Sequence, residues 1–273
     1  MPESRTPTGR SGRKLLPGLS VRDGYTRHPF DEQYGVRTSG LIAGRHLQSG
    51  HRHDRHNTAY YGVAPSVFDA LLARWRRAPQ IAPLDEYHFI DLGAGMGRAV
   101  LLASEHSFRA VTGVEIHPTL AAIARKNLTL WRTAGRARAP LHMVCQDVLD
   151  FTFPEGPCVL FLFNPFGAPV LRKLLRRVAE SFRGRAGQLD LLYVNHEQEH
   201  VLELQPGFRR LFIGQVRRSR ADAIADFKIL ANQPDGEYAS STYEDCSVWR
   251  WTGIEQGRGT RDKGRGEGAG TRK

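Results

Sequence analysis

Cysteine is scarce in this sequence, and long hydrophobic runs are missing from it. Cys145, Cys158 and Cys246 lie far apart in 273 residues, which argues against a disulfide framework and against a cysteine metal site. No apolar stretch approaches the roughly 20 residues that a membrane-spanning helix needs, and the first residues contain no apolar signal core. These absences predict a cytoplasmic protein that makes no membrane contact.

The body of the chain also lacks an excess of either charge. The formal net charge is +11, but residues 61–255 carry 23 Lys/Arg and 21 Asp/Glu. Most of the excess lies in residues 1–60 and in the tail 256–273, which has six basic and two acidic residues. A basic tail can contact nucleic acid weakly. Without interleaved aromatic residues, such a tail is more typical of a solubilising end.

Composition and periodicity divide the chain into four predicted parts. These are a disordered N-terminus at 1–20, an N-terminal extension with an amphipathic helix at 21–83, an α/β domain at 84–255 and a disordered basic tail at 256–273. The amphipathic helix covers 66–76, where apolar residues recur at four-residue steps.

The extension contains a histidine-rich stretch at 46–56, with His46, His51, His53 and His56. Such a run raises the question of a metal site. Two arginines stand among the histidines, and no carboxylate or cysteine completes a known ligand spacing. We therefore predict a solvated linker here and no metal site.

Strands and helices alternate from residue 87 onward. The predicted strands are 87–92, 109–115, 141–146, 157–163 and 189–195, and the helices between them include 118–133 and 168–183. This alternation predicts a doubly wound, mostly parallel Rossmann-like sheet. A short helix at 197–204 and strands at 208–214, 226–231 and 246–252 follow. Because these last strands lack helices between them, we expect an antiparallel pair at one edge.

A glycine turn follows the first of these strands, in the order Asp91-Leu92-Gly93-Ala94-Gly95-Met96-Gly97. A strand, a glycine turn and a helix N-terminus together form a nucleotide-cofactor site. The third glycine comes one residue earlier than in the dinucleotide fingerprint, and no Lys-Ser/Thr follows as in a P-loop. Asp91 would repel a pyrophosphate and favour a cation, such as a cofactor with an amino group and a sulfonium.

This stretch resembles the first motif of class I S-adenosylmethionine-dependent methyltransferases. The resemblance implies that the cofactor is S-adenosyl-L-methionine, and that it is bound by Asp91, Gly93, Ala94, Gly95 and Gly97. The domain at 84–255 would then be the methyltransferase domain.

Matching landmarks follow the next strands of the predicted sheet. Glu115 looks like the acid that holds the two ribose hydroxyls in this family, and Ile116 would lie against the adenine ring. Asp147, which precedes Val148, looks like the acid that accepts a hydrogen bond from the adenine amino group. Acids at the ends of successive strands make a stronger signal than a glycine turn alone.

The substrate side of the resemblance is the segment Asn164-Pro165-Phe166-Gly167, after the fourth strand. It is similar to the Asn-Pro-Pro-Tyr motif of methyltransferases that act on planar amino groups, but it lacks the second proline and has Phe for Tyr. The chain also resembles a largely uncharacterised bacterial group of class I methyltransferases with an Asn-Pro-Phe-Gly motif. In that group a tyrosine, here Tyr60, precedes the first helix and would cover the methionine end of the cofactor.

We therefore expect a methyltransferase that acts on an unidentified acceptor: a protein, a nucleic acid or a small molecule, with an amine nitrogen as one candidate. Asn164, Pro165 and Phe166 are the expected catalytic residues. A nicotinamide-dependent oxidoreductase and a non-catalytic nucleic-acid-binding protein with a Rossmann-like core are the alternatives. The first would need a later third glycine, and the second would depend on the basic ends.

Overall fold

The computed structural model describes residues 26–232 and 239–253. The predictions of disorder for 1–20 and 256–273 lie outside these residues. Within the described part of the chain, no helix is both long enough and apolar enough to cross a membrane.

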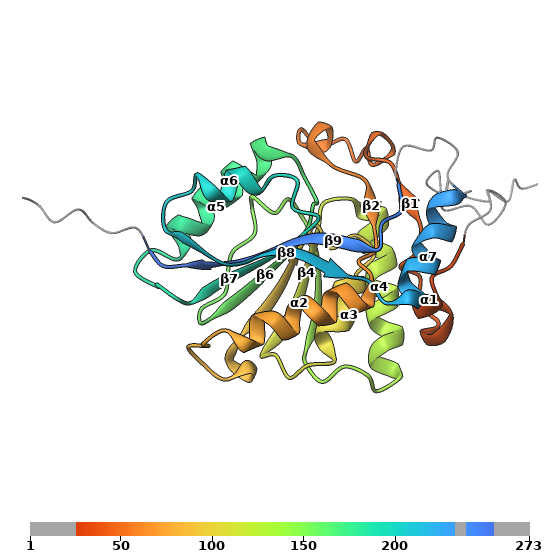
Figure 1. Cartoon of the computed structure of the whole chain (residues 1–273), viewed down its shortest axis with the longest axis horizontal. Coiled ribbons are helices and arrows are strands. Elements are labelled where there is room, and N and C mark those ends of the chain that lie inside the picture. The colour runs from red at the N-terminus through yellow and green to blue at the C-terminus, as the bar shows by residue number, and fades with distance from the viewer. Residues whose placement is uncertain (1–25, 233–238, 254–273) are drawn as a thin grey trace, which may run out of the picture.

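A seven-stranded sheet runs through the middle of the molecule (Figure 1). Its strands follow the spatial order β5-β4-β3-β6-β7-β9-β8. Their bounds are β3 His88–Leu92, β4 Ala110–Glu115, β5 Leu141–Cys145, β6 Cys158–Phe163, β7 Leu189–Val194, β8 Phe208–Arg217 and β9 Tyr243–Trp251. Only β9 runs against its neighbours β7 and β8, whereas the remaining pairs are parallel. This confirms the doubly wound, mostly parallel Rossmann-like sheet and its antiparallel pair at one edge.

Helices cover both faces of the sheet (Figure 1). One face carries α2 Pro65–Arg77, α3 Arg98–Ser104 and α4 Pro118–Thr133, and the other carries α5 Ala168–Ser181 and α6 Glu199–Glu203. The short helix α1 Pro29–Tyr34 and α7 Arg220–Ala231 lie at one end of the molecule, near the two-stranded sheet of β1 Leu41–Ile42 and β2 Tyr60–Tyr61. Three 3₁₀ turns complete the structure: η2 Gly44–His46, η3 Asp54–His56 and η4 Leu84–Glu86.

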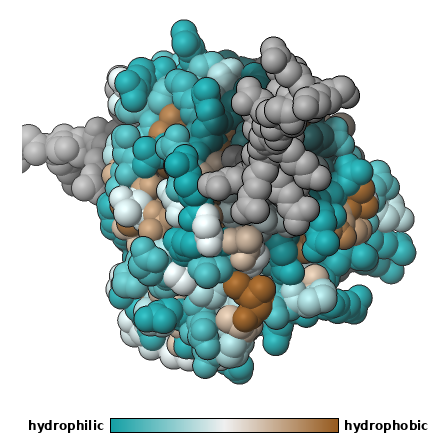
Figure 2. Space-filling view, turned by 90° about the vertical axis from the view of Figure 1, so that its left-hand side faces the viewer, coloured by the Kyte–Doolittle hydropathy of each residue, from teal (hydrophilic) through white to brown (hydrophobic). Residues whose placement is uncertain are grey.

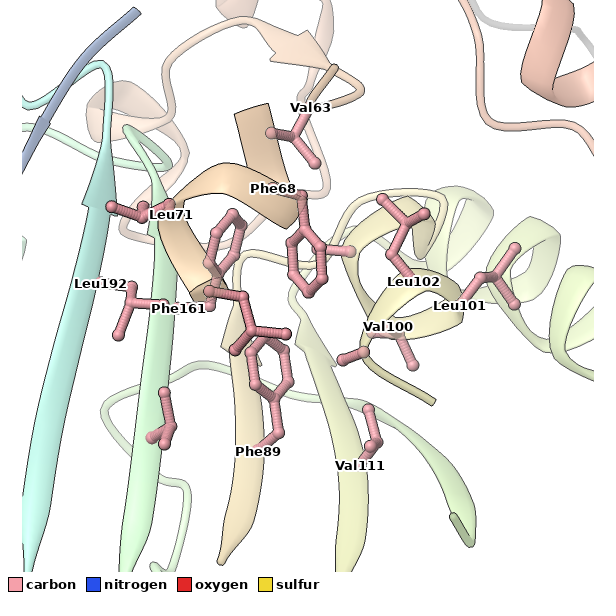
Figure 3. Close-up of a cluster of buried hydrophobic side chains, with 14 of the residues drawn as sticks. Val63, Phe68, Leu71, Phe89, Val100, Leu101, Leu102, Val111, Phe161 and Leu192 are labelled. Carbon is pink, nitrogen blue, oxygen red and sulfur yellow. The ribbon is translucent and has the colours of Figure 1, made fainter. Parts of the chain in front are cut away.

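The central strands are buried on both faces, as the apolar sequence of 157–163 predicts. Successive side chains of a strand point to opposite faces. On one face Phe89 and Phe161 pack against Phe68 of α2, with ring centroids 5.8 and 5.5 Å from that of Phe68 (Figure 3). On the other face Ile90 and Leu160 belong to the core formed with α5 and α6.

The predicted strand at 226–231 is wrong, because these residues belong to α7. Ser219 caps this helix by accepting a hydrogen bond from the Asp222 backbone N–H at 3.1 Å. The buried positions of α7 are Asp222, Ala225, Asp226 and Ile229, which follow the spacing of one helix face. Two of the four are charged, so the apolar pattern of this segment does not reveal the helix.

The prediction of a solvated linker at 46–56 is wrong, because Leu47, His53 and Asp54 are buried there, and the extension before this stretch is packed as well. Phe30 and Val36 belong to the core that α2 and α3 form with the sheet. Asp31 is buried and accepts hydrogen bonds from the backbone N–H groups of Thr38 and Ser39 at 2.6 and 2.8 Å. A carboxylate satisfied in this way can organise a segment that has no periodic apolar pattern.

The sheet brings the carboxyl ends of β3, β4, β5 and β6 to one edge. From β3 the chain goes to β4 on one side and later returns to β6 on the other, so β3 and β6 flank the point where the strand order reverses. In open α/β sheets this point is where ligands bind. The fold therefore places the strand-end acids of the sequence around one crevice.

Candidate functional site

A pocket lies at this edge of the sheet, lined by residues from the ends of β3 and β4 and from the loop after β5. The predicted site residues that line it are Tyr60, Asp91, Gly93, Ala94, Gly95, Glu115, Ile116, Asp147, Val148, Pro165 and Phe166. Gly97 and Asn164 are not among its lining residues.

The glycine turn after β3 is held by the neighbouring strand. The backbone N–H groups of Gly93 and Ala94 both donate to the carbonyl of Val114 at 2.9 Å. Gly93, Gly95 and Gly97 have φ of 85°, 53° and 87°, a region that glycine enters without steric cost. Gly97 is the N-cap of α3, where an added Cβ would lie 3.3 Å from the Ala124 side chain. Its role is therefore in packing α3 against α4.

Gly93 and Gly95 let two side chains approach the turn closely. A Cβ on Gly93 would lie 2.3 Å from Pro165 Cβ, and one on Gly95 would lie 2.2 Å from the Tyr60 ring. Real side chains do not reach such distances, so a larger residue at either position would require Tyr60 or Pro165 to move. Tyr60 and Pro165 thus form two walls of the pocket above the turn.

Asp91 and Glu115 place two buried carboxyl groups in the pocket. Burial and then the charge of Glu115 raise the pKa of Asp91 to about 8. Burial also raises the pKa of Glu115, although hydrogen bonds from the backbone N–H groups of His117 and Gly95 oppose that shift. Those bonds measure 2.7 Å to Oε1 and 2.8 Å to Oε2. Two acids desolvated side by side favour a ligand that brings positive charge or hydroxyl donors.

Asp147 meets the histidine-rich segment rather than open solvent. His53 Nδ1 lies 2.7 Å from Asp147 Oδ2, and His51 Nε2 lies 3.7 Å from the same oxygen. The other carboxylate oxygen accepts the Leu149 backbone N–H at 2.9 Å. Asp54 holds the histidine loop in place by accepting the backbone N–H groups of three residues from 49 to 51.

This cluster of His51, His53 and Asp147 has the composition of a metal site, with possible ligand atoms within 4.8 Å of one another. One hydrogen bond argues for a different role. The backbone N–H of His53 donates to His51 Nδ1 at 3.3 Å, so the neutral ring of His51 carries its proton on Nε2. That nitrogen then donates toward Asp147 instead of binding a metal ion.

Hydrogen bonds from the N-terminal extension hold the turn after β6 in place. Asn164 has a φ of 40°, a left-handed conformation that Asn tolerates better than most residues. The Thr58 hydroxyl donates to the Asn164 carbonyl, and the Thr58 backbone N–H donates to the Pro165 carbonyl at 3.4 Å. The Asn164 side chain accepts from the Tyr193 hydroxyl at 3.4 Å. Pro165 and Phe166 line the pocket, and Asn164 directly precedes them in the turn.

Arg98, the first residue of α3, holds the N-terminal extension against the pocket through hydrogen bonds. Its buried guanidinium donates to Thr38 Oγ1 at 2.7 Å, to the Gly62 carbonyl at 3.1 Å and to the Val63 carbonyl at 3.3 Å. The Tyr60 hydroxyl donates to the Thr38 carbonyl at 2.7 Å. Tyr60 therefore lies against the glycine turn, because the segments around Thr38 and Gly62 are anchored to α3, the helix that follows this turn.

His117 is a pocket residue that sequence reasoning missed. Its side chain is 4% exposed and lines the pocket beside Ile116. Within the described residues its Nδ1 is buried and has no hydrogen-bond partner. Burial lowers the pKa of His117, so the ring is neutral and Nδ1 offers a lone pair or a proton to a ligand. Its position directly after Glu115 and Ile116 was the available signal.

The strand order, the reversed strand β9 and the glycine turn after β3 define a class I methyltransferase fold. No protein-family model and no curated protein sequence matches the chain.

Solved structures with a similar fold include the [4+2]-cyclase SpnF, at 14% identity and a TM-score of 0.49 over 69% of this chain and 82% of that one. An RNA methyltransferase from Salinibacter ruber, crystallised with S-adenosyl-L-homocysteine, matches at 22% identity and a TM-score of 0.38 over 70% and 92%. A precorrin-6y C5,15-methyltransferase from Geobacter metallireducens matches at 14% identity and a TM-score of 0.44 over 68% and 86%. Since a fold does not fix a reaction, function has to rest on the residues of the site.

Proposed function

We propose that this protein is a methyltransferase that uses S-adenosyl-L-methionine. The observation that carries the proposal is the pair Asp91 and Glu115, two buried carboxyls that face one pocket across a glycine turn. A pyrophosphate would be repelled by such a pair. A ligand with an ammonium group, a sulfonium and ribose hydroxyls would be stabilised by it.

The residues of the pocket fit this cofactor along its length. Asp91 and the turn Gly93–Gly95 would hold the charged methionine end, and Tyr60 would cover it. Glu115 would accept the ribose hydroxyls. Ile116 and Val148 would contact the adenine ring, with Asp147 and His117 Nδ1, which has no partner among the described residues, as hydrogen-bonding groups around it. When bound, this cofactor supplies an activated methyl group.

The protein's own contribution is to position the acceptor and exclude water. The Asn164 side-chain oxygen and the Pro165 carbonyl each have two lone pairs, so they can accept from an amine in addition to Tyr193 and Thr58. A neutral amine held in this way would direct its own lone pair into the pocket. Positioning of this kind contributes up to roughly 7–11 kcal/mol in well-oriented systems. We include Asn164, Pro165 and Phe166 in the acceptor site on this basis.

The acceptor class can be tested with radiolabelled cofactor and a cell extract separated into protein, RNA and small-molecule fractions. Label should enter one fraction with the wild-type protein. Asn164→Gly removes the side-chain amide but tolerates the φ of 40°, so it separates a side-chain role from backbone strain. We expect Asn164→Gly to bind cofactor normally and to transfer label more slowly. Unchanged transfer would remove the Asn164 side chain from the acceptor site.

A further inference from the structure

A second hollow lies beside the cofactor pocket, over the exposed side of α5 and the loop after β5. We call its basic lining the α5 basic groove, defined by Arg52, Lys173, Arg176 and Arg177. Asp150 and Glu180 also line the hollow, so its lining carries more positive than negative charge. Figure 2 views the molecule from the end where α5 and α6 lie in Figure 1, and the surface there is mostly hydrophilic.

Three of these cations come from one face of α5. Lys173, Arg176 and Arg177 are spaced three and four residues apart, which places them side by side on a helix. All three are exposed, while the opposite face of α5 is buried in the core. Arg52 joins them from the histidine-rich segment, more than a hundred residues away in the sequence. Two independent segments therefore contribute to one concentration of charge.

Most of this charge is not neutralised by the protein. Arg52, Lys173 and Arg176 form no ion pair with any residue that the structure describes. Burial lowers the pKa of the adjacent His56, and the charges of Arg55, His53 and Lys173 lower it further. Unpaired cations held close together cost electrostatic repulsion, which an anionic partner would relieve.

The α5 basic groove adjoins the cofactor pocket along two segments. His53 and Val148 line the pocket, and their immediate neighbours Arg52 and Leu149 line the groove. A ligand that lies in the groove therefore reaches the rim of the pocket. Phe166 also lines the pocket, and it pairs in an isolated bridge with Asn57, which follows the histidine-rich stretch that contains Arg52.

The aromatic part of the pocket wall suits a planar group. Tyr61, Phe163 and Phe166 all line the pocket, and the Tyr61 and Phe163 rings meet edge to face with centroids 6.4 Å apart. Aromatic side chains stack with nucleic-acid bases irrespective of sequence. An arginine guanidinium pairs with phosphate oxygens through two parallel hydrogen bonds. The groove and the wall together match a phosphate chain with a base attached, whereas an acidic peptide would use the groove alone.

We propose that the α5 basic groove binds the phosphate backbone of a single-stranded nucleic acid whose base enters the cofactor pocket as the methyl acceptor. This inference rests on the proposed function for the entry of the base, but not for the binding of the backbone.

The test measures binding of a fluorescent 16-nucleotide single-stranded RNA by anisotropy, with the full chain and at several salt concentrations. The test variant is Lys173→Glu/Arg176→Glu. The matched control is Arg125→Glu/Lys126→Glu on α4, which makes the same change of net charge at two exposed residues. We expect the test variant to bind about tenfold or more weakly, with a salt slope reduced by roughly 1.4, since each single-strand phosphate contact contributes about 0.7. The control should stay within about twofold of wild type.

Equal losses in both variants, or no loss in either, would overturn the groove, because binding would then depend on net charge or on the basic ends of the chain. A polyglutamate peptide that bound as tightly, with the same sensitivity to the test variant, would overturn the choice of nucleic acid. Titration of each variant with S-adenosyl-L-homocysteine separates this result from the proposed function. If the protein binds cofactor but its RNA binding does not depend on the groove, only the proposed role of the groove is contradicted. If RNA binding depends on the groove but cofactor does not bind, only the proposed methyltransferase function is contradicted.

Discussion

Glu115 Oε2 accepts a hydrogen bond of 2.8 Å from the backbone N–H of Gly95, which ties the end of β4 to the glycine turn after β3. The other oxygen of Glu115 accepts from the His117 N–H at 2.7 Å. The carboxylate is therefore fixed before any ligand arrives, and Glu115 lines the pocket. A binding group that needs no rearrangement loses little entropy on binding.

The contact between Tyr60 and Gly95 predicts the effect of adding one methyl group to the turn. In Gly95→Ala the new Cβ would lie 2.2 Å from the Tyr60 ring, so the ring has to move off the turn. We expect a loss of about 1–3 kcal/mol of unfolding free energy, together with weaker cofactor binding. Urea unfolding and a titration with S-adenosyl-L-homocysteine measure the two effects.

Gly35→Ala is the matched control for this substitution. Gly35 has a similar φ of 67°, but none of the described residues lies within 4 Å of its added Cβ. This variant should lose only about 1 kcal/mol of unfolding free energy, the cost of a left-handed backbone conformation for alanine, and it should bind cofactor normally. If the two variants were indistinguishable, the close approach of Tyr60 would have no functional meaning.

The raised pKa of Asp91 predicts how stability depends on pH. Its carboxyl has a pKa of about 8 in the folded protein and an ordinary value of 3.8, so the folded state binds the extra proton between these values. Stability from this group is present below about pH 4 and is lost as pH rises to 8, by at most about 1.4 kcal/mol per pH unit. Asp91→Asn should flatten this dependence in urea unfolding at pH 5 and pH 8. An unchanged slope in the variant would show that Asp91 is ionised in the folded protein.

We expect the protein to lose stability when the planar guanidinium of Arg98 is replaced. In Arg98→Lys a single ammonium cannot reach Thr38, Gly62 and Val63 together, so buried acceptors lose their donors. We expect a loss of about 1–3 kcal/mol of unfolding free energy. The same change at the exposed Arg109 should have almost no effect. Equal stability of the two variants would mean that Arg98 does not hold the extension.

Because of the histidine cluster's hydrogen bonds, we expect the thermal stability of the protein not to depend on metal ions. Because the His53 N–H donates to His51 Nδ1, the cluster is a hydrogen-bonded support for Asp147. Chelator should leave the melting temperature unchanged, and added zinc should not raise it in wild type relative to His51→Ala. A zinc-dependent stabilisation that His51→Ala abolished would assign the cluster as a metal site instead.

The parts of the site that the sequence predicts are those set by strand periodicity. Asp91, Glu115 and Asp147 each end an apolar run, and parallel strands bring such ends to one edge. Thr58 and His53 could not be found in this way, because they lie in a polar segment whose contacts are with residues about a hundred positions away. Their placement depends on the buried carboxylates Asp31 and Asp54, which organise loops through hydrogen bonds rather than through a hydrophobic pattern.

Calorimetric titration of the protein with S-adenosyl-L-methionine, S-adenosyl-L-homocysteine and NAD decides whether the pocket binds the proposed cofactor. The proposed site should bind the first two and not NAD. Glu115→Gln should bind about 10–100-fold more weakly, as expected for the loss of a charged hydrogen-bond acceptor. The exposed Glu86→Gln should bind as wild type does. Absence of binding of either sulfur cofactor to the wild-type protein, or equal binding by Glu115→Gln, would contradict the account.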